Sequence, residues 1–344
     1  MIIAMVLATP GTGWGGMEKH TADLAGALTA LGHDVHVLAH PSYQTHFSGR
    51  SSFHPCPMHM GRRNPWLRYR IRRIVGTLHP EVVHAQGSKA ATLVSRLKLP
   101  PGCQKAGTVH GSKSTEKPFL PLDKVIAVST PVYQSLTHPR KFLVYNGIDV
   151  KPRDNTSSRA DAYRLPSAIN VVAAGRLESV KGFHRLVSSW PEVVERFPSA
   201  HLTIFGDGSQ RASLIEQIHQ LDCGEYISLP GYLTNLMPPL EQADLLVISS
   251  DREGFPYILV EALMSGCPVV STPVAGCTEI LPKEAIAADH SRAAISALLI
   301  KALSAIEELR QLEQPAFDYA REHLTLTAMA KATLEVYRDG VPRT

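Results

Sequence analysis

Cysteine is scarce in this chain of 344 residues, and its positions show no regular spacing. Neither the paired motif of a zinc site nor the even set of thiols that stabilises a small secreted domain is present. Between residues 41 and 65, histidines accompany Cys56, but no second pair stands at a ligand spacing. We therefore expect no metal and a protein of the reducing cytoplasm. The five cysteines are Cys56, Cys103, Cys223, Cys267 and Cys277.

Long apolar runs are also missing. No stretch approaches the ~20 consecutive apolar residues that a membrane-spanning helix needs. The apolar segment Ile2–Ala8 has neither a basic region before it nor a cleavage site after it. We therefore predict a buried strand at this segment and not a signal peptide.

A strong net charge is absent, since 35 Lys+Arg stand against 31 Asp+Glu and the formal net charge is +4. The charge is unevenly distributed, because residues 1–150 carry 17 Lys+Arg and 7 Asp+Glu, whereas residues 151–344 carry 18 and 24. The basic first part predicts an anionic partner for that part alone, such as a membrane surface or a phosphorylated acceptor. We expect no nucleic-acid partner.

The length and the composition favour two globular domains. With 44% hydrophobic and 19% charged residues, the chain is an ordinary globular protein that is long for one core. Residues 151–167, KPRDNTSSRADAYRLPS, are polar and have prolines near each end, which is typical of a linker. We therefore predict domains at residues 1–150 and 151–324, and a long amphipathic helical run at about residues 315–337.

Glycines follow the first predicted strand. Gly11, Gly13 and Gly16 form a G-x-G-x-x-G sequence before a predicted helix at residues 17–31, which alone is a weak signal for a dinucleotide site. Such a site needs an acidic residue at the end of the second strand. The second predicted strand, DVHVLAH, ends at Ala39-His40, so the sequence argues against NAD binding.

Short elements are predicted between this strand and the linker. Residues 41–65 are rich in proline, serine and histidine and are predicted as a long surface loop, whereas residues 65–78 are predicted as a basic helix. His84 and His110 each stand at the end of a predicted strand, where ligands bind to open α/β sheets, although a lone histidine there is usually structural. The strands are predicted at residues 81–85, 105–109 and 125–129.

Two carboxylates mark the second part of the chain. The run LLVISS, residues 245–250, is predicted as a buried parallel strand, and a helix is predicted at residues 257–265. Glu253 then lies at the carboxyl end of a strand, and Glu261 lies on the following helix. The backbone amides at the start of that helix favour an anion. This pattern predicts a ligand that carries phosphate and hydroxyl groups.

A second loop supplies cations. INVVAA is predicted as a strand and GRLESVKG as a loop, which places Arg176 and Lys181 within reach of an anion beside the same sheet edge. Arginine offers a planar fork and lysine a mobile point charge, and this pair suits two phosphates. From these residues alone, two solvated surface cations remain the alternative.

The stretch from Ser249 to Ile280, SSDREGFPYILVEALMSGCPVVSTPVAGCTEI, resembles the signature of the family 4 retaining glycosyltransferases. The acidic pair, the EGFP turn and the SGCPVVST continuation match it, and GRLESVKG resembles the GRL-x-x-x-KG loop of the family. The family usually has Gly-Gly and then proline where this chain has Ala275-Gly276 and Cys277-Thr278. The resemblance implies an α/β fold with two Rossmann-like α/β/α domains that face each other across a cleft, the GT-B fold.

The resemblance also implies roles for individual residues. Arg176 and Lys181 would hold the diphosphate of the donor, Glu253 the donor sugar and Glu261 the ribose, and His110 would line the donor-sugar side. Gly15-Gly16-Met17-Glu18 resembles the GG-x-E loop, which implies that the glycines approach the donor phosphates and that Glu18 contacts the acceptor, with His84 a weaker acceptor candidate. The remaining donor contacts would come from Gly231, Tyr232, Gly254, Phe255, Pro256, Tyr257, Ile258 and Leu259.

The resemblance implies a retaining, metal-independent hexosyl transfer from a nucleoside-diphosphate sugar to an acceptor hydroxyl. It also implies that a terminal helix, at about residues 325–344, packs back on the first domain, and that no cofactor is needed. We expect the acceptor to be a cell-envelope glycan or glycolipid such as lipopolysaccharide core. A nucleotide-sugar epimerase and a non-catalytic nucleotide-sugar-binding module remain alternatives.

The basic helix predicts a site of membrane attachment. Taking 100° per residue, the apolar residues fall on one face, and Arg68, Arg72 and Arg73 fall on the opposite face with Trp66 and Tyr69. Arginines interleaved with aromatic rings suit an anionic, partly apolar surface such as lipid headgroups, although a solvated helix face is the alternative. We expect a cytoplasmic protein that binds the inner face of the membrane through residues 62–73.

Overall fold

The computed structural model describes residues 1–111, 115–149 and 169–338, and the chain divides into two compact units. Unit 1 consists of Met1–Ile148 and Leu324–Thr344, and unit 2 of Asp149–His323. The predicted linker at residues 151–167 lies outside the described residues. Among the described residues, no helix is both long enough and apolar enough to cross a membrane.

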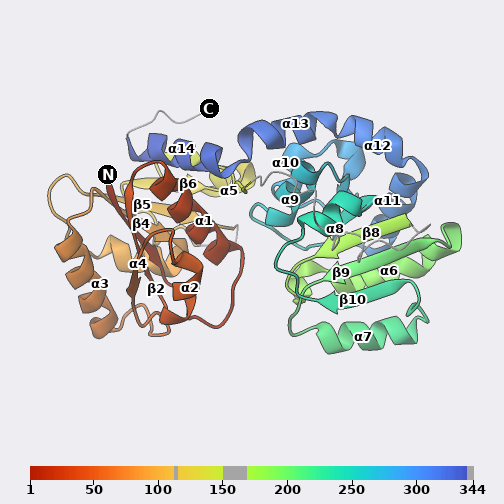
Figure 1. Ribbon diagram of the computed structural model, residues 1–344, viewed down its shortest axis with the longest axis horizontal. Coiled ribbons are helices and arrows are strands. Elements are labelled where there is room, and N and C mark those ends of the chain that lie inside the picture. The colour runs from red at the N-terminus through yellow and green to blue at the C-terminus, as the bar shows by residue number, and fades with distance from the viewer. Residues whose placement is uncertain (112–114, 150–168, 339–344) are drawn as a thin grey trace. The chain divides into compact units, whose positions relative to one another are not determined.

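The described part of unit 1 contains a seven-stranded parallel sheet in the order β3-β2-β1-β4-β5-β6-β7 (Figure 1). The direction of strand progression reverses between β1 and β4, which is the point where open α/β sheets bind ligands. The strands are β1 (Ile2–Leu7), β2 (Asp34–Ala39), β3 (Ser52–Pro55), β4 (Val82–Gln86), β5 (Gln104–Val109), β6 (Lys124–Ala127) and β7 (Lys141–Leu143).

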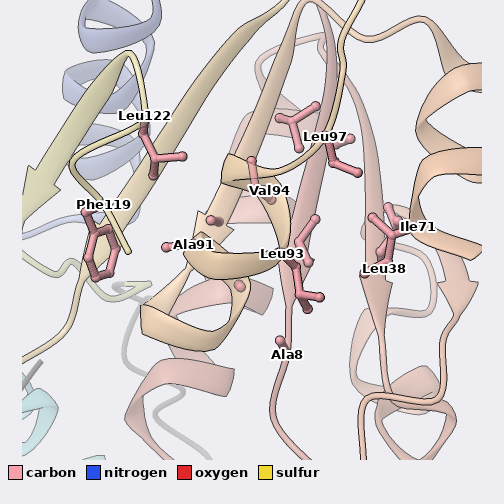
Figure 2. Close-up of a cluster of buried hydrophobic side chains, with 14 of the residues drawn as sticks. Ala8, Leu38, Ile71, Ala91, Leu93, Val94, Leu97, Phe119 and Leu122 are labelled. Atoms are coloured by element: carbon pink, nitrogen blue, oxygen red, sulfur yellow. The ribbon is translucent and has the colours of Figure 1, made fainter. Parts of the chain in front are cut away.

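Each face of this sheet has its own hydrophobic core, because successive side chains of a strand point to opposite faces. In β1, Ala4 and Val6 belong to one core, and Ile3, Met5 and Leu7 to the other. The first core contains side chains of α3 (Pro65–Leu78), α4 (Gly87–Ser95) and α5 (Thr130–Ser135), and Figure 2 shows part of it. The second core contains side chains of α1 (Gly16–Ala30) and α14 (Leu326–Tyr337).

The basic helix α3 forms where the sequence predicts it. The Asn64 side chain accepts hydrogen bonds from the backbone N–H groups of Trp66 and Leu67 at 3.0 and 3.1 Å, which caps the first turn. Leu67, Ile71 and Val75 are buried against the sheet, and each such side chain contributes roughly 1.5–3 kcal/mol of burial free energy. This burial fixes which face of α3 is left to solvent.

Helix α14 is attached to unit 1 by a buried lysine. The Lys124 side chain is 1% exposed, and its ammonium donates to the backbone carbonyls of Val336 at 2.7 Å and Tyr337 at 3.0 Å. A cation is favourable there because the carboxyl end of a helix carries partial negative charge. The predicted helical run at residues 315–337 consists of two helices, α13 (Gln314–His323) and α14, and the Thr325 side chain caps α14.

The described part of unit 2 contains a five-stranded parallel sheet in the order β10-β9-β8-β11-β12. Here the order reverses between β8 and β11. The strands are β8 (Ile169–Ala174), β9 (Ala200–Phe205), β10 (Ile227–Gly231), β11 (Leu245–Ile248) and β12 (Val269–Ser271). The helices include α6 (Phe183–Arg196), α7 (Arg211–Gln220), α8 (Met237–Gln242), α9 (Tyr257–Ser265), α11 (Arg292–Ser304) and α12 (Ile306–Leu312). Two parallel-sheet α/β domains confirm the predicted fold class.

The predicted loop at residues 41–65 is wrong. It contains a short helical segment (Pro41–Tyr43), α2 (Gln44–Phe47) and β3, which pairs with β2 as the edge of the sheet. Tyr43 and Phe47 are buried in the second core of unit 1. A four-residue edge strand that contains a proline carries almost no periodic signal, so its pairing with β2 could not be seen in the sequence.

Candidate active site

The carboxyl edge of the unit 2 sheet is built by loops that approach each other closely. Gly182 has a φ of +67° and a Cβ there would lie 2.0 Å from the Ser249 carbonyl oxygen. Gly206 has a φ of +146° and a Cβ there would lie 1.9 Å from the Gly175 carbonyl oxygen. Only glycine fits both positions. The loop after β8 is thereby held against the loops that follow β11 and β9.

This packing brings Lys181 and Glu253 together. The Lys181 ammonium lies 2.6 Å from Glu253 Oε1, and the Ser250 hydroxyl donates to the same oxygen at 2.6 Å. The Ser249 hydroxyl donates to the Lys181 carbonyl at 2.9 Å and fixes the backbone of that residue. The two charged side chains are only 20% and 13% exposed, so solvent screens their attraction less than it would at the surface.

Helix α9 begins beside this pair and has the bounds that the sequence predicts. Its N-cap is Pro256, which has no polar side chain to satisfy the first amides of the helix. Phe255 is buried, and a Cβ at Gly276 would lie 2.9 Å from its ring. The loop before α10 (Cys277–Ile280) therefore fixes the turn at Gly254–Pro256. Glu261 lies one turn into α9 and is half-buried.

The other predicted residues of unit 2 lie further out on the same edge. Arg176 follows β8 and is exposed. Gly231 ends β10, its carbonyl accepts from the Gly206 N–H at 2.8 Å, and Tyr232 beside it is 69% exposed. The structure therefore joins Lys181 and Glu253 directly and leaves Arg176 and Tyr232 accessible on the same sheet edge.

In unit 1, the glycine loop after β1 leads into α1. Gly15 is the N-cap of α1, and its N–H donates to Glu18 Oε2 at 3.0 Å. Glu18 is 8% exposed, so this carboxylate closes a capping box and shapes the loop. Its contact with an acceptor stays a prediction. Gly16 is the first residue of the helix and is exposed.

Four polar side chains meet where β4 and β5 end. His110 Nε2 lies 2.8 Å from Gln86 Oε1, and the His110 ring packs edge-to-face on His20 with centroids 4.7 Å apart. His20 Nδ1 lies 3.0 Å from Asn146 Oδ1. His110 is half-buried, and the other three are almost fully buried. His20 Nε2 and Gln86 Nε2 are buried atoms without a hydrogen-bond partner in the described structure.

Burial keeps these imidazoles neutral. It lowers the pKa of His20 to about 4, although Asn146 and Asp23 act in the opposite direction. Burial, together with the neighbouring His20 and His84, also lowers the pKa of His110 well below its ordinary value. At neutral pH the cluster can therefore exchange hydrogen bonds with hydroxyl groups but adds no positive charge.

His84 is not at the end of its strand, and we remove it from the candidate acceptor residues. It lies in the middle of β4 and is 0% exposed. Its Nδ1 lies 2.6 Å from the Tyr337 hydroxyl and its Nε2 2.7 Å from the Thr108 hydroxyl, and burial lowers its pKa to about 3. Because the His84 ring is inaccessible and both of its nitrogens have hydrogen-bond partners, it cannot bind an acceptor.

Sequence reasoning missed the rest of this cluster. His20 occupies the buried face of α1, where an apolar residue would be expected, and this was the signal that could have identified it. Gln86 lies one residue beyond the predicted end of β4. For the part of the chain that the structure describes, no group of three or more His, Cys, Asp and Glu side chains could hold a metal ion.

Two family models match the sequence, and each covers one part of the chain. Residues 14–151 match the model "Glycosyltransferase Family 4", and residues 161–318 match "Glycosyl transferases group 1". The chain belongs to the family 4 glycosyltransferases. This membership confirms the resemblance that the stretch from Ser249 to Ile280 carries.

Curated glycosyltransferases are similar over long stretches. A glycogen synthase of Mycobacterium tuberculosis is 24% identical over 381 residues, which covers 94% of this chain and 91% of that protein. The lipopolysaccharide core biosynthesis glycosyltransferase LpsE of Rhizobium meliloti is 26% identical over 210 residues, which covers 60% of this chain and 59% of that protein.

Solved glycosyltransferase structures have the same fold. A glycosyltransferase from Rickettsia africae superposes with a TM-score of 0.81 at 17% identity, covering 98% of both chains. Anabaena Alr3699/HepE in complex with UDP-glucose superposes with a TM-score of 0.78 at 16% identity, covering 98% of this chain and all of that one. At these identities the likeness establishes the GT-B fold for this glycosyltransferase.

Proposed function

We propose that this glycosyltransferase moves a hexosyl unit from a nucleoside-diphosphate sugar to an acceptor hydroxyl and retains the anomeric configuration. The observation that carries the proposal is the half-buried Lys181–Glu253 pair, 2.6 Å apart, where the strand order of unit 2 reverses beside the start of α9. An ammonium, helix amides and a carboxylate at one point suit a diphosphate joined to a sugar. The UDP-glucose complex of the HepE neighbour supports this donor class.

The transition state of such a transfer places negative charge on the leaving diphosphate. Lys181 uses one of its three donors on Glu253, which leaves two for phosphate oxygens, and the exposed Arg176 adds a planar fork. The first amides of α9 add further positive potential. These groups lower the barrier without a metal ion, since they stabilise the charge that a divalent cation would otherwise neutralise.

The carboxylates orient the donor. Both hydrogen bonds described for Glu253 reach Oε1, so Oε2 is the oxygen that would accept from donor-sugar hydroxyls. Glu261 would hold the ribose, and the exposed Tyr232 beside Gly231 would cover the base. The first turn of α9, Tyr257 to Leu259, would lie along the diphosphate.

We propose that unit 1 binds the acceptor. The neutral His110 would bond to a donor-sugar hydroxyl, and the Gly15-Gly16 loop lets backbone approach the donor phosphates. In the reaction, the bond between the anomeric carbon and the phosphate oxygen breaks while a bond to the acceptor oxygen forms on the same face. The acceptor proton passes to the leaving phosphate.

An assay with labelled donors tests this proposal. Wild-type protein is incubated with UDP- and GDP-hexoses, with and without glycan acceptors, and products are separated by mass and by anomeric configuration. Transfer with retention supports the proposal. Epimer formation would indicate the epimerase alternative, and donor binding without turnover would indicate a binding module. We expect activity to survive EDTA, and a loss that Mg²⁺ or Mn²⁺ restores would contradict the metal-free mechanism.

We further propose a cell-envelope acceptor and a place at the inner face of the membrane. The relative LpsE acts in lipopolysaccharide core biosynthesis, and α3 exposes Arg68, Arg72 and Arg73. Trp66 and Tyr69 are each 54% exposed on the same helix. Each cation near an anionic surface contributes about 1 kcal/mol, so several suffice for reversible attachment.

Liposome flotation tests the membrane proposal. Wild-type protein should bind anionic but not neutral liposomes, and less as salt rises. The triple variant Arg68→Ser, Arg72→Ser, Arg73→Ser should lose binding while transfer to a soluble acceptor is unchanged. If wild-type protein ignores anionic liposomes even at low salt, the helix face is merely solvated.

A further inference from the structure

Two surface cavities of unit 1 differ in where they lie on the sheet. One is lined by side chains near the carboxyl end of α3 and the segment before β5, including Arg72 and Leu99. It therefore lies at the amino edge of the parallel strands, away from the glycine loop. The other, of about 300 Å³, is lined by His40, His59, Trp66 and Arg70 and by prolines at the ends of β2 and β3. Only this second cavity lies at the carboxyl edge.

The second cavity is joined to the glycine loop by direct contacts. The His40 side chain packs on Gly11, where a Cβ would lie 2.1 Å from His40 Nδ1. The Ser42 hydroxyl donates to the Gly11 carbonyl at 3.1 Å, and the Tyr43 hydroxyl donates to the Gly13 carbonyl at 2.8 Å. The cavity therefore shares a wall with the loop that leads to Gly15 and Gly16.

The lining combines an aromatic surface with hydrogen-bonding groups. Trp66 is 54% exposed and stacks on Tyr69, with ring centroids 5.8 Å apart, so its indole is held in place yet accessible. An apolar ring face of this kind suits the C–H face of a pyranose. His40 Nδ1 lies 2.9 Å from the Ser42 hydroxyl and 3.3 Å from the Ser42 backbone nitrogen, so Nε2 is the His40 nitrogen that no described hydrogen bond uses. The His59 ring lies 5.6 Å from the His40 ring.

The charge of the lining has one sign. Arg70 is half-buried, and its Nε donates to the Pro55 carbonyl at 2.9 Å, which orients the guanidinium at the end of β3. None of the described lining residues is a carboxylate. Burial, and to a smaller extent the neighbouring His59, lowers the pKa of His40, so Arg70 supplies the positive charge of the lining.

We propose that this cavity binds a sugar that carries an anionic group, phosphate or carboxylate, as the part of the acceptor next to the hydroxyl that is glycosylated. Trp66 stacks on the pyranose, His40 and His59 bond to its hydroxyls, and Arg70 binds the anion through its remaining N–H donors. The proposal rests on the proposed function and extends it, because it assigns the acceptor to the class of acidic or phosphorylated glycans.

Direct binding without donor tests this assignment independently of transfer. The full-length protein is titrated with glucose 6-phosphate, glucuronate, glucose and inorganic phosphate. Binding of each compound is measured by ligand-observed NMR and by calorimetry. The two acidic sugars should bind at least about tenfold more tightly than glucose and than phosphate alone, since a bond to a charged group is stronger than a neutral one. Equal affinity for glucose and for both acidic sugars would overturn the proposal.

Matched variants locate the site. Arg70→Met should remove the preference for acidic sugars. Trp66→Leu should weaken the binding of glucose and of glucose 6-phosphate equally. Arg68→Met on the same helix removes an equal charge outside the cavity and should change neither. If Arg68→Met weakens the binding of glucose 6-phosphate as much as Arg70→Met does, the sugar phosphate is attracted only by the overall basic charge of the helix. The cavity is then not the site. His59→Ala, at an exposed position, provides a second test should Arg70→Met fail to fold.

A lipid headgroup could present the same anion. Vesicles with phosphatidylserine are therefore added to protein saturated with glucose 6-phosphate. Retention of the sugar phosphate supports the proposal. Its displacement by vesicles, together with a loss of vesicle binding in Arg70→Met, would overturn the proposal in favour of a lipid site. Binding of acidic sugars by a protein that shows no transfer with any donor would refute the proposed function but leave this site intact.

Discussion

The two parallel sheets have similar strand order but place different chemistry at their carboxyl edges. In unit 2 the edge carries ions, with Lys181 and Glu253 2.6 Å apart and Arg185 paired with Asp251. In unit 1 the ends of β4 and β5 carry a histidine cluster whose pKa values are lowered by burial, and the cation Arg70 lies apart from it at the end of β3. The strand order thus determines where a ligand binds. The loops that follow the strands determine whether charged or neutral side chains contact that ligand.

The largest expected effect comes from removing a cation from the charged edge. Lys181→Met and Arg176→Ala should each lower kcat/KM by about 10²-fold or more, because each removes a contact to charge that develops on the leaving diphosphate. Steady-state kinetics with a saturating acceptor measures this. Lys301→Met, at an exposed position on α11, is the control. Unchanged kinetics in both site variants would show that unit 2 does not bind the diphosphate.

Substitutions of the two carboxylates of unit 2 should change different kinetic constants. Glu253→Gln should lower kcat by about tenfold or more, whereas Glu261→Gln should chiefly raise the KM for the donor. The ribose is remote from the bond that breaks, so its contact should be equally strong in the ground and transition states. A fall in kcat with unchanged KM for Glu261→Gln would mean that the two roles are assigned wrongly.

The neutral edge should respond more weakly to mutation. His110→Ala should lower kcat/KM by roughly 3- to 10-fold, the cost of a neutral hydrogen bond. Because burial lowers the pKa of His110 well below its ordinary value of 6.5, activity should show no limb from this ring near pH 6.5. His219→Ala, exposed on α7, is the control. A limb near pH 6.5 that disappears in His110→Ala would contradict the neutral edge.

The last expected effect is on stability and not on activity, and its sign differs between the units. Glu313 is 0% exposed, its Oε2 accepts from the Val269 N–H at 2.9 Å, and burial raises its pKa to about 8. Folded unit 2 therefore retains a proton that the unfolded chain releases above its ordinary pKa of 4.5. Its free energy of unfolding should fall by up to about 1.4 kcal/mol per pH unit as pH rises from 5 to 8.

Urea unfolding at several pH values tests this difference. In a background without Trp14 and Trp66 of unit 1, the fluorescence of Trp190, which is 0% exposed, follows unit 2. Glu313→Gln keeps the carbonyl acceptor and should flatten the fall in stability. For His20 the sign is opposite, because its folded pKa of about 4 lies below the ordinary 6.5, so unit 1 should lose stability as pH falls through this range. Equal pH slopes for wild type and Glu313→Gln would refute the assignment.

How much of this could be predicted from the sequence depended on how local each signal was. Helix α9 and the basic helix α3 have the predicted bounds, because caps, prolines and apolar spacing act within a few residues. Edge strand β3 was missed, because its pairing with β2 joins segments that are distant in the sequence. Motif spacing identified Lys181 and Glu253 as candidates but could not show that they meet.

The histidines illustrate the limit most clearly. The sequence placed His84 and His110 alike at the ends of strands, but β4 continues to Gln86, which leaves His84 inside the sheet. His84 stands two residues before the end of β4 and is fully buried, whereas His110 follows the last residue of β5 and is half-buried. His20 was missed because a helix pattern does not reveal which side chains another element covers.

The hydrogen bonds from Lys124 to the last turn of α14 have a consequence for how the chain folds during its synthesis. Unit 1 consists of Met1–Ile148 and Leu324–Thr344, so the ribosome synthesises all of unit 2 before the last helix of unit 1 appears. At ~5–20 residues per second, the intervening segment takes roughly 10–35 s to synthesise. During that interval Lys124 lacks the two carbonyls that it binds, and the core that receives Met329 and Leu334 stays uncovered. A nascent chain stalled within unit 2 would thus present chaperones with an apolar surface that the finished enzyme never shows.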